Sequence, residues 1–144
     1  MSDILVDIHK NISSPRERVA GYIEDFRNAR EWMVGVENVE HTGAAEYKLA
    51  LETPVGRLQP EAKVVEHRPG YIRWVYTSTI EGEGRVEVES DENRGCVVRY
   101  AGSFRLKGGI LGRAAKAVGM EGFARRQGER SLDRLKHLME ARRY

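Results

Sequence analysis

The side chains that could carry nucleophilic or metal chemistry are few in this 144-residue sequence, and their spacing matches no common motif. The four histidines, His9, His41, His67 and His137, show neither HxH nor HxxxH spacing, and the single cysteine, Cys96, excludes a CxxC-type zinc site. No GxSxG elbow, GxGxxG fingerprint or Walker loop is present. We therefore predict no metal site and no cofactor, and we expect Cys96 to be a buried, reduced thiol.

The candidates for acid–base chemistry are two tyrosines and one glutamate. Tyr76 and Tyr100 fall on the apolar faces of two predicted strands, and Glu66 falls in the same inward register near a strand end. A phenol or a carboxyl group inside an apolar site can donate or accept a proton. If the protein is an enzyme, Tyr76, Tyr100 and Glu66 are candidate catalytic residues, with Tyr47 as a further tyrosine of the same kind.

The composition indicates an ordinary globular chain that forms one domain over residues 1–144. Hydrophobic residues make up 40% of the sequence, and no stretch approaches the roughly 18–20 apolar residues of a membrane span. The first ten residues, MSDILVDIHK, carry acidic residues where a signal peptide has basic ones. These features predict a cytoplasmic protein, and the near-neutral net charge of +2 gives no general attraction to nucleic acid.

The small net charge hides a division of the chain. Residues 1–104 carry 13 basic and 18 acidic side chains, whereas residues 105–144 carry 11 basic and 4 acidic ones. The first segment therefore has a net charge of −5 and the second a net charge of +7. Any anionic surface or protein partner is expected to meet the basic residues Arg113, Lys116, Arg125, Arg126 and Arg130.

The pattern of the first third predicts a strand followed by two short helices. Residues 4–12 alternate between apolar and polar side chains, which is typical of a half-buried strand. Ser14, Pro15 and Glu17 have the order of an N-cap, a first helical residue and the partner of a capping box. A second short helical piece is expected over residues 28–33.

The middle of the chain predicts an antiparallel sheet. Period-two alternation with short connections marks strands over residues 36–42, 46–53, 56–67, 71–80, 84–90 and 96–106. Pro60 lies inside the third of these runs and indicates an edge or a bulge there.

A long helix is expected to close the chain. Its apolar stripe contains Leu111, Ala114, Ala115 and Val118, and then Leu132, Leu135, Leu138 and Met139. Between these two groups, Gly122, Arg125 and Gly128 occupy positions where bulky apolar residues would continue the stripe. The helix could bend there, approach another backbone closely, or cover a space that another molecule fills.

This order of elements resembles the SRPBCC superfamily, which includes START-like domains and polyketide cyclase/dehydrases. The segment ISSPRERVAGYIEDFRNAREWMVGVENVE is similar to the family in its small-Pro turn and in the helix reading Val19-x-x-x-Ile23-x-Asp25, and SLDRLKHLME resembles the family's closing helix. The resemblance implies an α+β helix-grip fold. In that fold a curved antiparallel sheet of about seven strands wraps around a long C-terminal helix, with two short helices after strand one.

The resemblance also implies a ligand cavity between the sheet and the C-terminal helix. The apolar strand faces and the glycine-rich part of the helix then supply the predicted ligand-binding residues: Tyr47, Leu49, Leu51, Leu58, Val64, Trp74, Tyr76, Ser78, Tyr100, Phe104, Val118, Gly122 and Phe123. Ile110, Leu111, Met120 and Phe123 could form an apolar lid or pack against the sheet, and Phe26 and Trp32 are expected in the core or at the cavity end.

Three functions remain open at this level. The first is binding of a hydrophobic or aromatic small molecule of the lipid, isoprenoid or polyketide class, because apolar walls with sparse polar groups suit such ligands. The second is a polyketide cyclase/dehydrase (aromatase-like) enzyme that uses tyrosine or glutamate residues of the cavity. The third is an interaction module that uses the basic C-terminal helix, and the sequence does not distinguish a monomer from a homodimer.

Overall fold

The computed structural model describes residues 4–54, 56–91, 95–106 and 119–141. In this part of the chain the strands are β1 (Ile4–Ile12), β2 (Val36–Gly43), β3 (Glu46–Thr53), β4 (Gly56–Leu58), β5 (Glu61–Arg68), β6 (Tyr71–Tyr76), β7 (Ile80–Ser90) and β8 (Cys96–Leu106). The helical segments are α1 (Arg16–Glu24), the 3-10 turn η1 (Phe26–Asn28), α2 (Ala29–Trp32) and α4 (Met120–Ala141).

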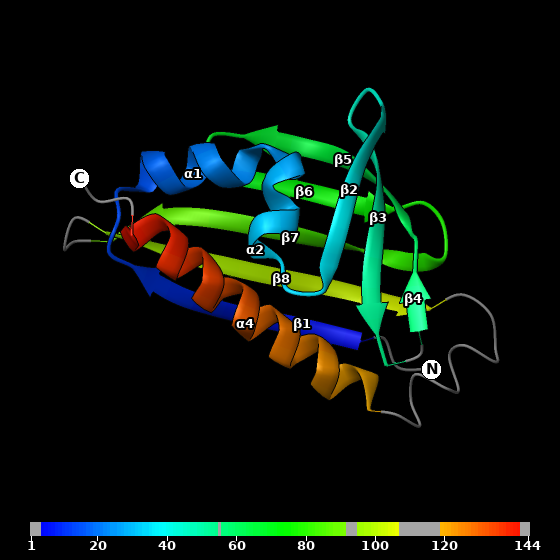
Figure 1. Ribbon diagram of the computed structural model, residues 1–144. Helices are drawn as coiled ribbons and strands as arrows, with labels where there is room; N and C mark the ends of the chain where they lie inside the picture. Colours follow the sequence, from blue (N-terminus) through cyan, green and yellow to red (C-terminus); the bar gives the residue numbers. More distant parts are fainter. Residues whose placement is uncertain (1–3, 55, 92–94, 107–118, 142–144) are drawn as a thin grey trace.

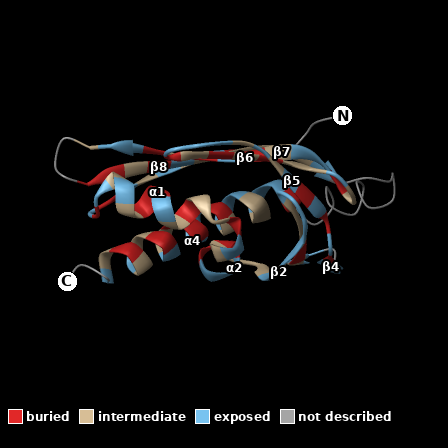
Figure 2. Cartoon of the chain, turned by 90° about the horizontal axis from the view of Figure 1, so that it is seen from above, coloured by how far each residue is buried: buried red, intermediate tan, exposed pale blue. Residues whose placement is uncertain are grey.

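The strands form one antiparallel sheet in the order β1-β8-β7-β6-β5-β3-β2, and the short strand β4 pairs with β3. Helix α4 runs alongside β1 (Figure 1). Figure 2 shows α1, α2 and α4 together on one side of the sheet, so that the buried side chains meet between the two layers. This is the predicted helix-grip arrangement, with β4 added to the expected seven strands.

The predicted strand bounds fail at two places. Gln59 and Pro60 separate β4 from β5, so that the single strand expected over residues 56–67 is two strands. Proline has no N–H to donate to a ladder, which explains the break. The strand expected over residues 71–80 ends at Tyr76, and Ile80 already belongs to β7. Thr79 has a φ of 68° in this turn. Because this left-handed conformation is rare for a β-branched residue such as threonine, the sequence gives no sign of the turn.

The start of α1 also differs from the prediction. The helix begins at Arg16 with Pro15 as its N-cap residue, and no side chain caps it. The Ser14 hydroxyl is buried and has no hydrogen-bond partner among the described residues, so the predicted capping box is absent.

Two polar side chains of α1 instead fasten it to the sheet. Arg16 donates from Nε to the Val88 carbonyl oxygen over 3.0 Å. At the other end, Glu24 accepts from the Gly70 N–H over 3.1 Å and lies 2.9 Å from Nε2 of His67. Burial raises the pKa of the Glu24 carboxyl, but the contacts with His67, Gly70 and Arg16 together lower it below its ordinary value.

The main hydrophobic core joins α1, the sheet and the second half of α4. Its members include Ile12, Val19, Val88, Val98 and Leu135, all at most 2% exposed. Such β-branched and leucine side chains fill space between a sheet and helices without polar atoms.

Cys96 belongs to the main core and is buried, as the sequence predicts. Burial raises the pKa of its thiol to about 11, and the nearby carboxylates of Asp91 and Glu17 add to this rise. The thiolate, which is the reactive form, is therefore scarce at neutral pH.

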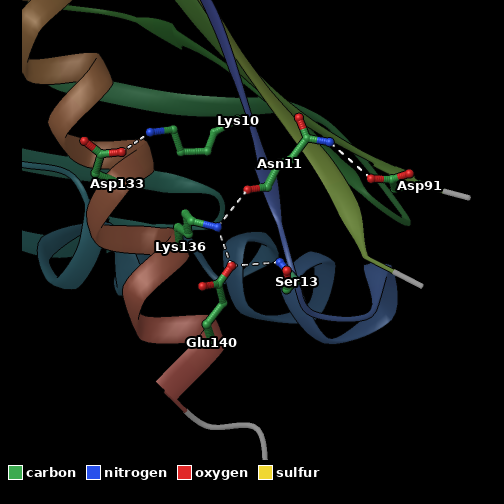
Figure 3. A network of polar contacts seen from close by, with 7 residues as sticks. All are labelled: Lys10, Asn11, Ser13, Asp91, Asp133, Lys136 and Glu140. Atoms are coloured by element: carbon green, nitrogen blue, oxygen red, sulfur yellow. Dashed lines mark hydrogen bonds and ion pairs between the residues drawn. The ribbon is translucent and has the colours of Figure 1, made fainter. Parts of the chain in front are cut away.

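A polar seam holds α4 against the end of β1 (Figure 3). Lys10 forms an ion pair with Asp133, and Lys136 lies between the backbone oxygen of Asn11 and the carboxylate of Glu140. Glu140 in turn accepts from the Ser13 N–H over 2.9 Å. Because these contacts are partly exposed, they add little to the stability of the fold. Their main effect is to fix the position of α4 against β1.

Candidate ligand cavity

A cavity of about 140 Å³ lies between the inner face of the sheet and the first half of α4. Strands β1, β2, β3, β4, β6, β7 and β8, the turn η1, α2, the connection after α2, and α4 all contribute to it. Its described lining consists of Val6, Phe26, Trp32, Met33, Val34, Gly35, Val36, Leu49, Leu51, Glu52, Thr53, Leu58, Trp74, Tyr76, Ile80, Tyr100, Phe104, Met120, Phe123, Ala124, Gln127, Gly128 and Ser131.

Two glycines of the sheet lie beside aromatic rings that line the cavity. Gly84 of β7 pairs with Trp74 on one side and with Gly102 of β8 on the other. A Cβ atom at Gly84 would lie 2.5 Å from the Trp74 ring, and one at Gly102 would lie 3.4 Å from the Tyr100 hydroxyl. Because both positions lack a side chain, the large rings of Trp74 and Tyr100 can lie against the sheet.

Aromatic rings line the sheet side of the cavity. The Trp74 ring lies 5.2 Å from Phe26 in an edge contact and 6.4 Å from Tyr100 in a stacked one. Tyr76 meets Phe104 edge-on, with ring centroids 6.5 Å apart. Phe104, Tyr76 and Phe123 also pack against a second small apolar cluster that contains Ile80. Rings in such contacts offer flat apolar surface to a small ligand.

The wall on the helix side is made by six residues of α4: Met120, Phe123, Ala124, Gln127, Gly128 and Ser131. A Cβ atom at Gly128 would lie 2.8 Å from Cδ1 of Ile8, so the helix and β1 approach closely at this point. One turn away, Ser131 donates to the Gln127 carbonyl oxygen over 2.6 Å and accepts from the Val34 N–H over 2.8 Å. This contact ties the connection after α2 to the helix.

The hydroxyl groups of Tyr76 and Tyr100 are the main polar groups inside the cavity. Burial raises the pKa of both phenols; the nearby Trp74 indole N–H opposes the rise for Tyr76, and Tyr76 adds to it for Tyr100. Both therefore stay protonated at neutral pH and can donate hydrogen bonds. The charged side chain in the described lining, Glu52, is exposed.

The sequence matches the family model "Polyketide cyclase / dehydrase and lipid transport" over residues 4–140. The chain belongs to this family. The match spans nearly the whole chain, and it confirms the resemblance to the SRPBCC superfamily. No protein with curated functional information matches the sequence significantly.

Solved structures of this superfamily share the fold. A protein from Thermus thermophilus is 18% identical, with a TM-score of 0.75 over 97% of this chain and 99% of that one. A START superfamily protein from Mycobacterium smegmatis is 12% identical, with a TM-score of 0.72 over 95% of this chain and 97% of that one. The Zhui aromatase/cyclase from a Streptomyces species is also 12% identical, with a TM-score of 0.72 over 96% and 94%.

Most of the predicted site residues of this family member lie together. Those that line the cavity are Leu49, Leu51, Leu58, Trp74, Tyr76, Tyr100, Phe104 and Phe123. Met120, predicted as lid or core, also lines it. Val118, Ile110 and Leu111 lie outside the described residues.

Four predicted residues lie elsewhere. Tyr47 stacks on His41, with ring centroids 4.8 Å apart, and Val64 packs on the edge of the main core. Ser78 lies beyond the end of β6, where its hydroxyl accepts from the Glu61 N–H over 3.0 Å. Gly122 is on the exposed side of α4.

Glu66 does not point into the cavity, and the prediction of its inward register is wrong. The register of β5 against β6 shifts between Val64 and Glu66, because the extra residue Val65 forms an irregularity in the ladder. Glu66 therefore emerges on the outer face with Arg73, to which it is ion-paired over 3.2 Å, and it also pairs with Arg68 over 2.5 Å. A one-residue insertion reverses the orientation of the side chains that come after it in the strand.

Part of the helix and loop side of the cavity is missing from the predicted site residues. Val34, Gly35, Gln127 and Ser131 line it, although none of them belongs to an apolar strand face. Ser131 did carry a signal, since it is a polar residue directly beside Leu132 on the buried face of the helix.

Among the predicted basic residues, Arg125, Arg126 and Arg130 are exposed on α4 and do not line the cavity, whereas Arg113 and Lys116 lie outside the described residues. In the part of the chain that the structure describes, no group of three His, Cys, Asp or Glu side chains could hold a metal ion. No helix there is long and apolar enough to span a bilayer.

Proposed function

We propose that the protein binds a hydrophobic small molecule in this cavity. The observation that carries the proposal is an apolar space lined by aromatic rings from the sheet and closed by the first half of α4. A ligand there would replace the side chains that a solid core would have at this place. Membership of a family described by polyketide cyclisation and lipid transport agrees with such a ligand.

The volume limits what fits without movement of the walls. A cavity of about 150 Å³ holds one benzene molecule, whereas pockets for drug-sized ligands have about 300–1,000 Å³. The 140 Å³ found here therefore admits a single aromatic ring or a short acyl segment. A longer lipid, isoprenoid or polyketide would enter only as such a segment, or after Phe123 and Met120 turn aside.

Catalysis of the cyclase/dehydrase type is the second candidate. The Tyr76 and Tyr100 hydroxyls inside the cavity favour it, as does the shared fold with an aromatase/cyclase. Their raised pKa values allow them to donate hydrogen bonds at neutral pH but not to act as bases. Since Glu66 faces outward, the described lining supports binding better than turnover.

An interaction role of the basic helix rests on a separate observation. Arg126, Arg130 and Arg134 follow one another at i, i+4 and i+8 on α4, all exposed, and none forms an ion pair with a described residue. Co-sedimentation with anionic vesicles at low and high salt tests this role, because such attraction weakens as salt rises. Equal binding to neutral and anionic vesicles would contradict it.

The binding proposal is tested by titration of the protein with benzene and toluene, followed through backbone amide NMR signals. We expect saturable shifts at residues such as Tyr76, Tyr100 and Phe123. Ala124→Phe should abolish these shifts by filling the cavity, whereas the exposed control Arg126→Phe should retain them. Native mass spectrometry of protein from its own host would then identify any co-purified mass. Absence of saturable shifts in the folded wild type would refute the proposal.

A further inference from the structure

The two tyrosine hydroxyls of the cavity have free protons. Tyr76 and Tyr100 lie on β6 and β8, and both line the cavity. Neither donates a hydrogen bond to a described residue. A ligand oxygen could accept a hydrogen bond from either of these hydroxyls.

A third donor lies beside them. The Trp74 indole N–H is buried, and no described residue accepts from it with hydrogen-bond geometry. It lies near enough to Tyr76 to influence the titration of that phenol. Tyr76 and Tyr100 thus each have a proton to donate, and the Trp74 N–H lies beside the Tyr76 hydroxyl.

The charge of the lining restricts the ligand further. The described lining contains no lysine, arginine or histidine, and its carboxylate, Glu52, is exposed. An anion would lose its hydration in this cavity without gaining a counter-ion from the described lining, which is unfavourable. The lining therefore favours an uncharged molecule.

We propose that the cavity selects a neutral, single-ring aromatic molecule that carries one hydroxyl or carbonyl oxygen. Its ring would lie among Trp74, Phe104 and Phe123, and its oxygen would accept a hydrogen bond from Tyr76 or Tyr100. This inference rests on the proposed binding function and adds the size, charge and polar group of the ligand. A ring of this kind is also the terminal unit of a larger aromatic molecule.

The test compares phenol with toluene, which has the same shape with a methyl group in place of the hydroxyl. Dissociation constants are measured for the wild type, Tyr76→Phe, Tyr100→Phe and the control Tyr47→Phe. We expect at least one cavity variant to bind phenol about 3- to 10-fold more weakly while its toluene affinity is unchanged. Tyr47→Phe should leave both affinities unchanged, because Tyr47 lies outside the cavity lining.

Each other outcome counts against a defined statement. If both probes bind and their affinity ratio is the same in all four proteins, the hydroxyls do not select the ligand and the inference is wrong, although the binding function stands. If neither probe binds to folded wild type, the binding function fails first. Benzoate should bind at least tenfold more weakly than phenol, and equal binding would contradict the selection for a neutral molecule.

Discussion

The two halves of helix α4 perform different tasks on the same sheet. In the second half, Leu132, Leu135 and Met139 are at most 1% exposed and belong to the main core. In the first half, Phe123, Ala124 and Gln127 line the cavity, whereas Gly122 and Arg125 face solvent. The second half therefore makes a solid core, whereas the first half roofs a cavity.

The sheet differs in the same way. The main core contains the β-branched residues Val88 and Val98, which fill the space between the layers. Under the cavity, Gly84 and Gly102 stand opposite each other, and aromatic rings lie across them. The difference teaches that this cavity needs two coincident features: small residues on the helix, and glycines that let rings lie flat on the sheet.

The largest expected effect separates the two halves of α4 directly. Leu135→Ala should lower the free energy of unfolding by about 2–5 kcal/mol, because it opens a void in a fully packed core. Phe123→Ala should lower it by less than about 2 kcal/mol, because that half-buried ring already borders a cavity. Urea unfolding measures both values. Equal losses would show that the two halves are packed alike.

The second prediction concerns Gly84, which lies against the Trp74 ring. Gly84→Ala should destabilise the protein by about 1–3 kcal/mol, since the new methyl group would lie 2.5 Å from the rigid Trp74 ring. The matched control is Gly21→Ala in α1, where a Cβ atom meets nothing within 4 Å. That change should stabilise the helix by up to about 1 kcal/mol. A neutral Gly84→Ala, measured by thermal unfolding, would mean that the indole does not need the glycine.

The third prediction concerns the hydrogen bond between Ser131 of α4 and Val34 in the connection after α2. Ser131→Ala leaves the Val34 N–H without its acceptor and should destabilise the protein by about 1–2 kcal/mol. Hydrogen exchange at Val34 should accelerate at the same time. Ser90→Ala, at an exposed position of β7, serves as the control. Unchanged exchange at Val34 would argue that the hydroxyl does not hold this wall.

The smallest expected effect concerns Glu24, the last residue of α1, which packs on the main core. Its pKa is lowered in the folded state, so its contacts stabilise the fold above pH 4.5, and this contribution is lost as the pH falls through the folded-state pKa. Glu24→Gln should be less stable than the wild type at pH 7 by below about 1 kcal/mol, because the partner His67 is exposed to solvent.

Urea midpoints at pH 7 and pH 3 give the measurement for Glu24. The difference between wild type and Glu24→Gln should shrink at pH 3, whereas the exposed control Glu89→Gln should show little difference at either pH. A difference that grows toward pH 3 would reverse the sign of the argument.

Much of the fold follows from local patterns. The predicted bounds of β1, β3 and β8 agree with the structure, because each strand alternates apolar and polar residues along its length. The turn at residues 77–79 was missed because threonine and serine there continue the strand pattern, and only the left-handed φ of Thr79 reveals the turn. The predicted Ser14 cap is absent because Pro15, and not Ser14, is the N-cap residue of α1.

The candidate site was predicted on the sheet and only in part on the helix, where the predicted Phe123 lines the cavity. Tyr76, Tyr100 and Trp74 follow from strand parity, which holds wherever the ladder is regular. Parity failed at Glu66, because one extra residue in β5 moves that side chain to the outer face. Ser131 shows only the signal of a polar residue on a buried helix face, and Gln127 shows none. The role of both depends on Val34, which lies more than 90 residues away in sequence.

The sequence by itself determined the order of the elements, the apolar face of each strand and the gap in the apolar stripe of the last helix. These are properties of near neighbours along the chain, and hydrophobic periodicity records them directly. Only the tertiary structure decided that, of the three positions in this gap, Gly128 approaches β1 closely and lines a cavity of 140 Å³, whereas Gly122 and Arg125 face solvent. The size of a cavity depends on how side chains from distant segments pack against one another. A single bulge or a pair of glycines changes that packing without altering the local hydrophobic pattern of the sequence.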